Sequence, residues 1–180
     1  MIQIRKGVFE TNSSSTHSIC ISKTPVKNLP EFVCFVPGEY GWEDAIVDDT
    51  ASYLWEAILD GPPLLVEPRK ERLAAALDRL GVKYYFKYPQ KSSNGEWYEY
   101  GYIDHSDECA DLIEALLSND DLLARYLFSD SVIYTGNDNC NEQGDLCYSA
   151  DEEIWDEDTN EYIPNPNHHP DKYTYFFKGN

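Results

Sequence analysis

Five apolar residues that recur with the period of an α-helix give the clearest structural signal in this chain. They occupy relative positions i, i+3, i+4, i+7 and i+8 and are Cys109, Leu112, Ile113, Leu116 and Leu117. Acidic side chains fill the opposite face, at Asp107, Glu108, Asp111 and Glu114. An apolar stripe of this kind is buried against another layer of structure, so the segment predicts an amphipathic helix packed on a core.

Helix-start and helix-stop residues predict three further helices. One runs over residues 50–60, with Asp49 as its cap and Gly61 at its end. A second starts at Pro68, a residue suited to a first helical position, and stops at Gly81. A short helix follows the capping sequence at residues 118–121.

Alternating or β-branched and aromatic runs predict the strands. They lie at residues 2–5, 17–22, 31–36, 131–135 and 173–177, and the aromatic runs 82–88 and 97–103 flank a turn-forming stretch that predicts a hairpin. Together these elements predict an α+β fold, with a mainly antiparallel sheet and three to four helices packed on one face. We expect a single domain over residues 1–180, with a long acidic connection at 136–171.

Composition excludes several classes of protein. Hydrophobic residues make up 42% and aromatic residues 14% of the 180 residues, which argues against a disordered chain. No apolar run approaches the ~18 residues that span a bilayer, and the N-terminus lacks the apolar run of a secretory signal. Five cysteines without CxxC spacing favour reduced thiols over disulfides. We therefore expect a protein of the cytoplasm, in a bacterial host.

Acidic residues are concentrated in the second half of the chain. Residues 92–171 contain 21 acidic residues and one basic residue, Arg125, whereas residues 1–91 contain 12 acidic and 11 basic residues. Phosphate contacts need Lys and Arg, so this half opposes direct binding to nucleic acid and to anionic membranes. It is compatible with a basic protein groove, a cationic ligand or a divalent metal as partner, and equally with a surface whose acidity serves solubility alone.

Two acidic segments also contain large aromatic residues, which a purely solvating tail seldom includes. We interpret them as partner-binding surfaces, in which aromatic anchors supply affinity and carboxylates imitate a row of phosphates. Their residues are Glu96, Trp97, Tyr98, Glu99, Asp151, Glu152, Glu153, Trp155, Asp156, Glu157, Asp158, Glu161 and Tyr162. Exposed aromatic side chains are also compatible with a homodimer.

A polar string near the N-terminus, residues 5–18, concentrates hydroxyl, carboxylate and imidazole groups. One interpretation is a catalytic site with Ser13, Ser14 or Ser15 as nucleophile, His17 as base and Glu10 as the orienting acid. The other is a turn between two strands, in which the hydroxyl groups bond to nearby backbone. Catalytic triads are defined by geometry, so the sequence leaves both interpretations open.

Metal and cofactor motifs give no prediction of a bound group. His105 lies between two aspartates and His168–His169 is in a proline-rich loop, but neither has the spacing of a metal site. Residues 137–145 are similar to a calcium loop in composition, with the glycine at the wrong position. Glycine-rich phosphate loops are absent from the sequence, and we expect no cofactor.

The string Arg5-Lys-Gly-Val-Phe-Glu-Thr-Asn-Ser-Ser-Ser-Thr-His-Ser18 resembles the opening of a group of uncharacterised proteins from phages and Gram-positive bacteria. Members often carry a downstream T-G-N-D-N string, here Thr135 to Asn139. The resemblance implies no established activity, so it assigns no catalytic residue. In size and acidity the chain is similar to phage-encoded DNA mimics, including anti-CRISPR inhibitors.

Two functional hypotheses follow from these features. The favoured one is an acidic interaction protein that blocks the nucleic-acid-binding groove of a bacterial defence nuclease, as an anti-CRISPR DNA mimic does. Its partner would be a basic nucleic-acid-binding protein, such as a CRISPR effector nuclease. The alternative is an enzyme, a hydrolase or transferase, with its site at Glu10, Ser13–Ser15 and His17.

Overall fold

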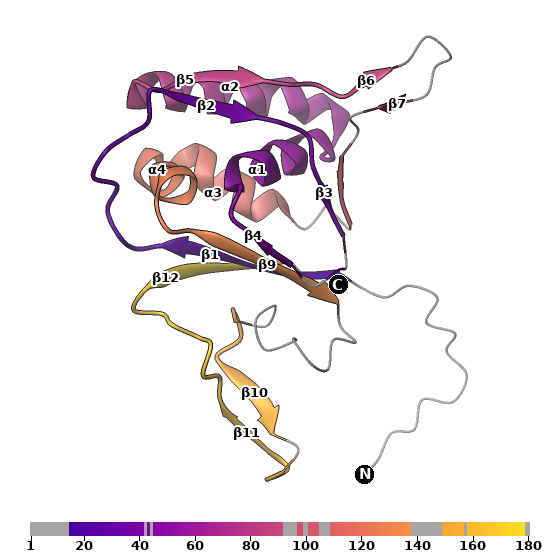
Figure 1. Ribbon diagram of the computed structural model, residues 1–180, viewed down its shortest axis with the longest axis vertical. Helices are drawn as coiled ribbons and strands as arrows, with labels where there is room; N and C mark the ends of the chain where they lie inside the picture. The colour runs from indigo at the N-terminus through magenta and orange to yellow at the C-terminus, as the bar shows by residue number, and fades with distance from the viewer. Residues whose placement is uncertain are drawn as a thin grey trace.

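A four-stranded antiparallel sheet is the base of the molecule in the computed structural model, which describes residues 15–41, 43, 45–91, 97–98, 101–104, 109–137, 149–156 and 158–178. The strand order is β12–β1–β9–β4. These strands span β1 Ser15–Ser22, β4 Ala45–Val47, β9 Val132–Asn137 and β12 Tyr173–Lys178. The helices cover one face of the sheet (Figure 1), and the predicted α+β fold with a mainly antiparallel sheet is confirmed.

Strand β1 lies in the centre of the sheet, and all eight of its residues are buried. Successive side chains of a strand point to opposite faces. Ile19 and Ile21 join the hydrophobic core with the helices. Ser18 and Cys20 instead contact the segment after β9, because Ser18 Oγ accepts from the amide of Ala150 at 3.3 Å and Cys20 Sγ lies 3.4 Å from Ser149 Oγ. The strand is therefore covered on both faces.

The four helices begin and end close to the predicted positions, with one exception. They span α1 Thr50–Leu59, α2 Pro63–Leu80, α3 Ala110–Ser118 and α4 Asp120–Phe128. Asp49 caps α1 by accepting from the amide of Ser52 at 3.1 Å, as predicted. Asn119 caps α4 in the same way, by accepting from the amide of Leu122 at 3.1 Å.

Helix α2 is the exception, because it starts at Pro63 rather than at the predicted Pro68. Pro63 occupies the first turn, where a missing amide hydrogen has no cost, and Pro68 lies inside the helix. The predicted stop is confirmed: Gly81 adopts a left-handed conformation with φ of 74°, and its amide bonds back to the last turn.

One short strand pair lies on the other side of the helices from the sheet, and a second lies beside α1 and runs towards the sheet (Figure 1). Strand β2 (Phe32–Phe35) pairs in parallel with β5 (Lys83–Phe86), and β3 (Glu39–Tyr40) pairs in parallel with β8 (Tyr102–Ile103). The predicted hairpin forms only as β6 (Gln90–Lys91) with β7 (Trp97–Tyr98). The aromatic runs on either side of it pair elsewhere, because α1 and α2 connect β2 to β5 as a crossover.

Helix α1 lies at the centre of the core, and its residues Thr50 to Ile58 are all buried. Trp55 is fully buried between strands and helices, with its ring centroid 4.9 Å from that of Phe86, and its Nε1 donates to the backbone carbonyl of Lys87 at 2.5 Å. The other helices and strands β1, β2 and β9 contribute an apolar set that includes Ile19, Ile21, Phe35, Leu73, Leu77, Ile113, Leu116 and Ile133.

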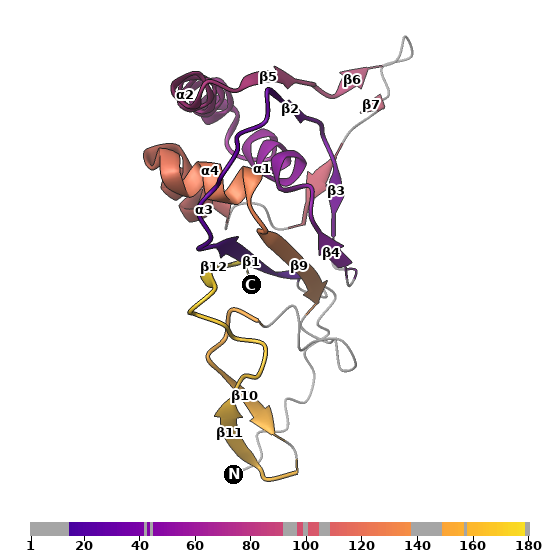
Figure 2. The ribbon, with the colours of Figure 1, turned by 60° about the vertical axis from the view of Figure 1, so that its left-hand side comes forward.

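A hairpin lies within the segment that we predicted to be a connection, residues 136–171. Strand β10 (Glu153–Asp156) pairs antiparallel with β11 (Glu161–Pro164), and β9 extends into the segment as far as Asn137. Figures 1 and 2 show this hairpin projecting from the sheet, away from the helices. The described residues of the acidic segment therefore include regular structure that the sequence did not predict.

Three of the five cysteines lie in the part of the chain that the structure describes, and all three are free thiols. Cys20 and Cys109 are buried, and Cys34 is exposed. Within that part of the chain, no helix combines the length and the apolar character needed to cross a bilayer.

Candidate functional site

The β10–β11 hairpin carries two large aromatic side chains at directly opposite positions. Trp155 pairs with Tyr162 across the hairpin, and their ring centroids lie 5.2 Å apart in an edge-to-face arrangement. Both stay accessible to solvent, with exposed fractions of 51% and 68%. An aromatic pair of this size exposed at the end of a projecting element is typical of a contact surface.

Local polar contacts explain why this acidic sequence forms a hairpin. Asp156 closes the turn by accepting from the amide of Asp158 and from Thr159 Oγ1, both at 2.9 Å. These bonds hold the pKa of the Asp156 carboxyl below its usual value. Asn160 has a φ of 53°, a left-handed conformation that asparagine tolerates better than most residues.

Asn165 joins the two ends of the hairpin at its base. It is buried, its amide donates to the carbonyl of Glu152, and its Nδ2 donates to the carbonyl of Asp151, both at 2.9 Å. Nearby, the ring of His168 stacks on Tyr175 of β12 with a centroid distance of 4.6 Å. The hairpin is therefore anchored at its base and free of such contacts at its aromatic end.

Most of the predicted partner-binding residues of the second segment lie on this hairpin. Those that the structure describes there are Asp151, Glu152, Glu153, Trp155, Asp156, Asp158, Glu161 and Tyr162, whereas Glu157 lies outside the described residues. Residues 149–171 contain no Lys or Arg. Burial raises the pKa of the Asp151 carboxyl, which lies at the anchored base.

The first predicted segment is separated from the hairpin. Glu96 and Glu99 lie outside the described residues, and the backbone of Trp97 and Tyr98 forms β7. Figures 1 and 2 place β6–β7 at the opposite end of the molecule from β10–β11. The structure thus does not bring the two predicted segments together into one surface.

His17, the predicted base, is fully buried, and both of its ring nitrogens are engaged. Nε2 lies 2.9 Å from the carbonyl oxygen of Gly41, which can only accept, so Nε2 carries the hydrogen. Nδ1, 2.8 Å from the Tyr53 hydroxyl, therefore accepts from it. Desolvation lowers the pKa of His17 to about 4, so the imidazole is neutral at physiological pH.

Tyr53 connects His17 to a cysteine. The Tyr53 oxygen lies 3.8 Å from Cys109 Sγ, and since the hydroxyl hydrogen is donated to His17, the thiol is the donor to Tyr53. This gives a directed chain of hydrogen bonds from Cys109 through Tyr53 and His17 to the Gly41 carbonyl. It joins α3, α1 and β1, which are far apart in the sequence.

Ser15, the one candidate nucleophile within the described residues, contacts a different group. Its Oγ donates to the carbonyl of Asp104 at 3.1 Å and accepts from Lys178 Nζ, which also donates to the Ser15 carbonyl at 3.2 Å. Ser15 and Lys178 are both buried. Glu10, Ser13 and Ser14 lie outside the described residues, so the full catalytic string stays a prediction.

The buried carboxylate of Glu56 on α1 and the half-buried carboxylate of Asp60, directly after α1, bond to backbone next to β3 and in β8. Glu56 Oε2 accepts from the amide of Gly38 at 3.0 Å, and Asp60 accepts from the amide of Ile103 at 2.5 Å. Burial is the main cause that raises the pKa of Glu56 to about 7 and that of Asp60 above its usual value. Within the described chain, Glu56 Oε1 and the Tyr126 hydroxyl are buried without a hydrogen-bond partner.

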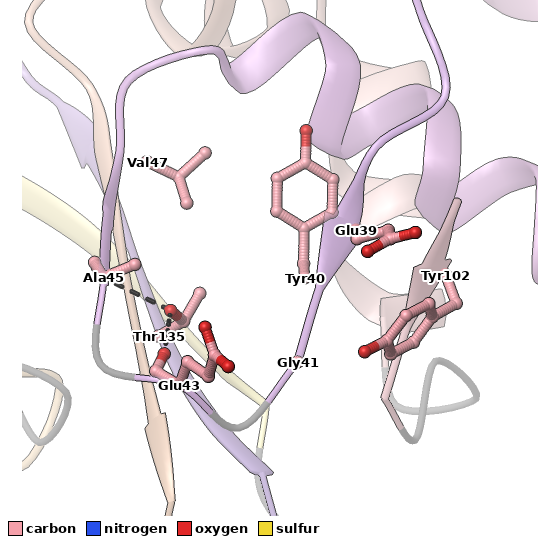
Figure 3. Close-up of a pocket in the computed structure, with 8 residues that line it drawn as sticks. All are labelled: Glu39, Tyr40, Gly41, Glu43, Ala45, Val47, Tyr102 and Thr135. Carbon is pink, nitrogen blue, oxygen red and sulfur yellow. Dashed lines mark hydrogen bonds between the residues drawn. The ribbon is translucent and has the colours of Figure 1, made fainter. Parts of the chain in front are cut away.

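A cleft of about 190 Å³ lies next to these hydrogen bonds, between strands β3, β4, β8 and β9 (Figure 3). Its floor includes Thr135, whose Oγ1 donates to the carbonyl of Glu43 at 2.7 Å, and Gly41, whose carbonyl bonds to His17. The remaining walls are Glu39, Tyr40, Glu43, Ala45, Val47 and Tyr102. Figure 3 shows the Tyr40 ring standing between Val47 and Glu39.

Sequence reasoning missed Tyr53, Glu56, Cys109, Lys178 and the cleft residues. Tyr53 and Glu56 are inside a helix that was correctly predicted, but periodicity reports only which face is buried. Their partners lie 18 to 56 residues away in the chain, a separation that no local pattern encodes. A buried Glu in an apolar helix face was the one available signal for Glu56.

No group of three His, Cys, Asp or Glu side chains that could hold a metal ion occurs among the residues that the structure describes. Comparison with protein-family models, with curated proteins and with solved structures gave no match to this chain.

Proposed function

We propose that this protein is an acidic interaction protein that occupies the nucleic-acid-binding groove of a bacterial defence nuclease, such as a CRISPR effector. One observation supports this above the others. The β10–β11 hairpin exposes Trp155 and Tyr162 within a segment, residues 149–171, that has carboxylates and no basic residue. Such a surface is complementary to a groove lined by Lys and Arg.

The aromatic side chains and the carboxylates would have different roles in binding. Large aromatic side chains bury roughly 150–250 Å² each and dominate the energetics of interfaces. Carboxylates such as Glu152, Glu153 and Glu161 would steer association with a basic partner and make it sensitive to salt. The complex should therefore form at low ionic strength and weaken as salt rises.

The shape of the hairpin suits a groove better than a flat surface. Each strand has four residues, which at ~3.4 Å per residue gives a ribbon about 14 Å long. The base of the hairpin is joined to the sheet through His168, which stacks on Tyr175 of β12, so the hairpin can enter a groove without rearrangement of the core. Preorganisation of this kind reduces the entropic cost of binding.

The test is capture of a partner from host lysate by tagged protein, at low and at high salt. Three carboxylates of the hairpin are neutralised in one variant, Glu152→Gln, Glu153→Gln and Glu161→Gln. A matched control neutralises three exposed carboxylates elsewhere, Glu31→Gln, Asp48→Asn and Glu71→Gln. Wild type and control should capture a basic nucleic-acid-binding protein that is lost as salt rises, and the hairpin variant should capture much less.

Capture of equal amounts of the basic protein by the hairpin variant and by its control would show that the hairpin is not the contact surface. A second hairpin variant, Trp155→Ala with Tyr162→Ala, tests the anchors without changing charge. Both residues are exposed, so each of these variants should keep the wild-type melting temperature. Capture of no basic protein by the wild type in either buffer would overturn the proposal for that host.

The alternative of an enzyme at the N-terminal string has less support. His17 bonds to Tyr53 and Gly41 rather than to Ser15, and its lowered pKa makes it a weak base. Replacement of His17 by Ala still distinguishes a catalytic from a structural role for this string. Loss of an activity at an unchanged melting temperature would favour an enzyme, and a large fall in melting temperature would favour a structural role.

A further inference from the structure

The cleft between β3, β4, β8 and β9 combines three kinds of wall that are used together to bind organic cations. Glu39 and Glu43 supply carboxylates, Tyr40 and Tyr102 supply aromatic rings, and Ala45 and Val47 supply apolar surface. Carboxylates attract a positive head group, and ring faces attract it through their negative quadrupole. The apolar wall suits the aliphatic part of such a ligand.

The two carboxylates of the cleft have no protein counter-charge within the described residues. Glu39 and Glu43 take part in none of the ion pairs found there, and no Lys, Arg or His lines the cleft. The arginines of helix α2 differ, because Arg69 and Arg72 pair with Glu114, and Arg79 pairs with Asp120. The cleft therefore keeps uncompensated negative charge.

A third carboxyl group, that of Glu56 on α1, bonds beside the cleft and responds to its charge. Glu56 is only 1% exposed, and its Oε2 bonds to the amide of Gly38, the residue directly before Glu39. Its Oε1 is the unpartnered buried oxygen described above, and the charge of Glu39 contributes to its raised pKa. A cation beside Glu39 would offset this repulsion.

The size of the cleft limits what it can hold. Its volume of about 190 Å³ is smaller than the ~300–1,000 Å³ of sites for drug-sized ligands. It is several times the ~30 Å³ that one water molecule occupies in the liquid. A cationic head group with a short chain of carbon atoms fits this range, whereas a nucleotide does not.

We propose that this cleft binds one organic cation, an ammonium or guanidinium group on a short aliphatic stem. Glu39 and Glu43 hold the charge, the rings of Tyr40 and Tyr102 pack against the head group, and the stem lies on Val47. This chemistry is available from a free alkylamine and from the Lys or Arg side chain of a polypeptide. The site is independent of the hairpin and of its proposed partner.

The test is an NMR titration of the isolated full chain, followed at the Val47 methyl groups and the Tyr40 ring. The probes are n-butylammonium and n-butylguanidinium, with n-butylurea as a neutral analogue of the same shape. We expect saturable shifts with the two cations and none with the urea. The variant with Glu39→Gln and Glu43→Gln should bind at least about tenfold more weakly, a loss of ~1.4 kcal/mol.

A matched control keeps the total charge change the same. Glu31→Gln with Glu71→Gln removes two exposed carboxylates outside the cleft and should leave the affinity unchanged. Glu39 and Glu43 are themselves exposed, so the cleft variant should keep the wild-type amide spectrum outside the cleft. Equal binding of the urea, equal binding by the cleft variant, or no saturable shift with either cation would each overturn the proposal.

A second set of probes in the same NMR titration identifies the source of the cation. Nα-acetyl-lysine and Nα-acetyl-arginine N-methylamides carry the same head groups on a peptide backbone. Affinity equal to that of the butyl probes supports a polypeptide side chain as the ligand. Binding of the butyl probes alone supports a free amine or guanidine. The hairpin variants should bind every probe as the wild type does, which separates this result from the test of the proposed function.

Discussion

Tyr53 on α1 donates its hydroxyl hydrogen to Nδ1 of His17 on β1, across 2.8 Å of fully buried interior. The bond requires a neutral imidazole, because a protonated ring has a hydrogen on both nitrogens and no acceptor to offer. The helix layer and the central strand are therefore joined by a contact that depends on the protonation state of one side chain.

Acid should weaken the fold through His17. Its pKa is about 4 in the folded protein against 6.5 as the ordinary value, so the unfolded chain binds the proton more readily between these two values. Stability is therefore full above about pH 6.5 and falls as pH drops towards 4, by as much as about 3 kcal/mol. Urea unfolding of the wild type and of a His17 variant, each at pH 7 and at pH 4.5, measures this difference, because Glu56 titrates over the same range with the opposite sign in both proteins.

The variant His17→Gln isolates the contribution of the imidazole. It should be less stable than the wild type at pH 7, because it loses buried hydrogen bonds worth about 1–3 kcal/mol. Its deficit in the free energy of unfolding relative to the wild type should shrink at pH 4.5, because the folded wild type no longer gains stability there from a neutral His17. A deficit of the same size at both pH values would contradict a buried neutral histidine.

Alkali should weaken the fold through Glu56, with the opposite sign. Its pKa is about 7 in the folded protein against an ordinary 4.5, so the folded state retains a proton that the unfolded state has lost. Stability is full below about pH 4.5 and falls as pH rises through 7. Glu56→Gln should therefore gain about 2 kcal/mol relative to wild type between pH 5 and pH 8, allowing for solvent screening.

Glu71→Gln is the control for this experiment, since Glu71 is an exposed residue of α2. Chemical denaturation of both variants at the two pH values gives the comparison directly. The control should show the same difference from wild type at pH 5 and pH 8. If Glu56→Gln behaved like the control, Glu56 would be ionised in the folded protein at neutral pH.

Gly101 should tolerate no side chain, because it packs against the same carboxylate. A Cβ added there would overlap Glu56 Oε2 and the backbone of Gly38. Gly101→Ala should therefore lower stability by roughly 1–3 kcal/mol or more, as overpacking does. Gly81→Ala has open space and suffers only from its left-handed φ, at about 1 kcal/mol. Thermal unfolding should rank the Gly101 variant as the less stable of the two.

The sequence was sufficient to predict elements whose signals are local. Asp49 and Gly81 are correct helix boundaries because a cap and a left-handed stop depend on residues a few positions apart. The strands 17–22 and 173–177 are correct for the same reason, since their alternation is local. The start of α2 was wrong because two prolines, Pro63 and Pro68, both satisfied the rule for a first turn.

Pairing and the site depend on contacts that no local pattern contains. The run at 82–88 has a strand pattern, but the pattern cannot tell a hairpin partner from β2, which lies about fifty residues earlier. Ser15 and His17 share one face of β1, yet each bonds to a residue of another element, Lys178 or Tyr53. The β10–β11 strands were missed because carboxylates occupy three of their eight positions and Pro164 ends β11, so neither strand shows a clear apolar pattern.

The three described cysteines should differ in reactivity towards a thiol reagent at pH 8. Cys34 is exposed and should react first, whereas Cys20 is buried and its pKa is raised to about 11. Only the thiolate reacts, so about one Cys20 in a thousand is competent at pH 8 even before burial limits access. Peptide mapping by mass spectrometry should find Cys34 labelled in the native protein, and Cys20 and Cys109 labelled only after unfolding. In Cys34→Ser the label on the Cys34 peptide disappears while Cys20 stays protected, and native labelling of Cys20 as fast as that of Cys34 would contradict the covered face of β1.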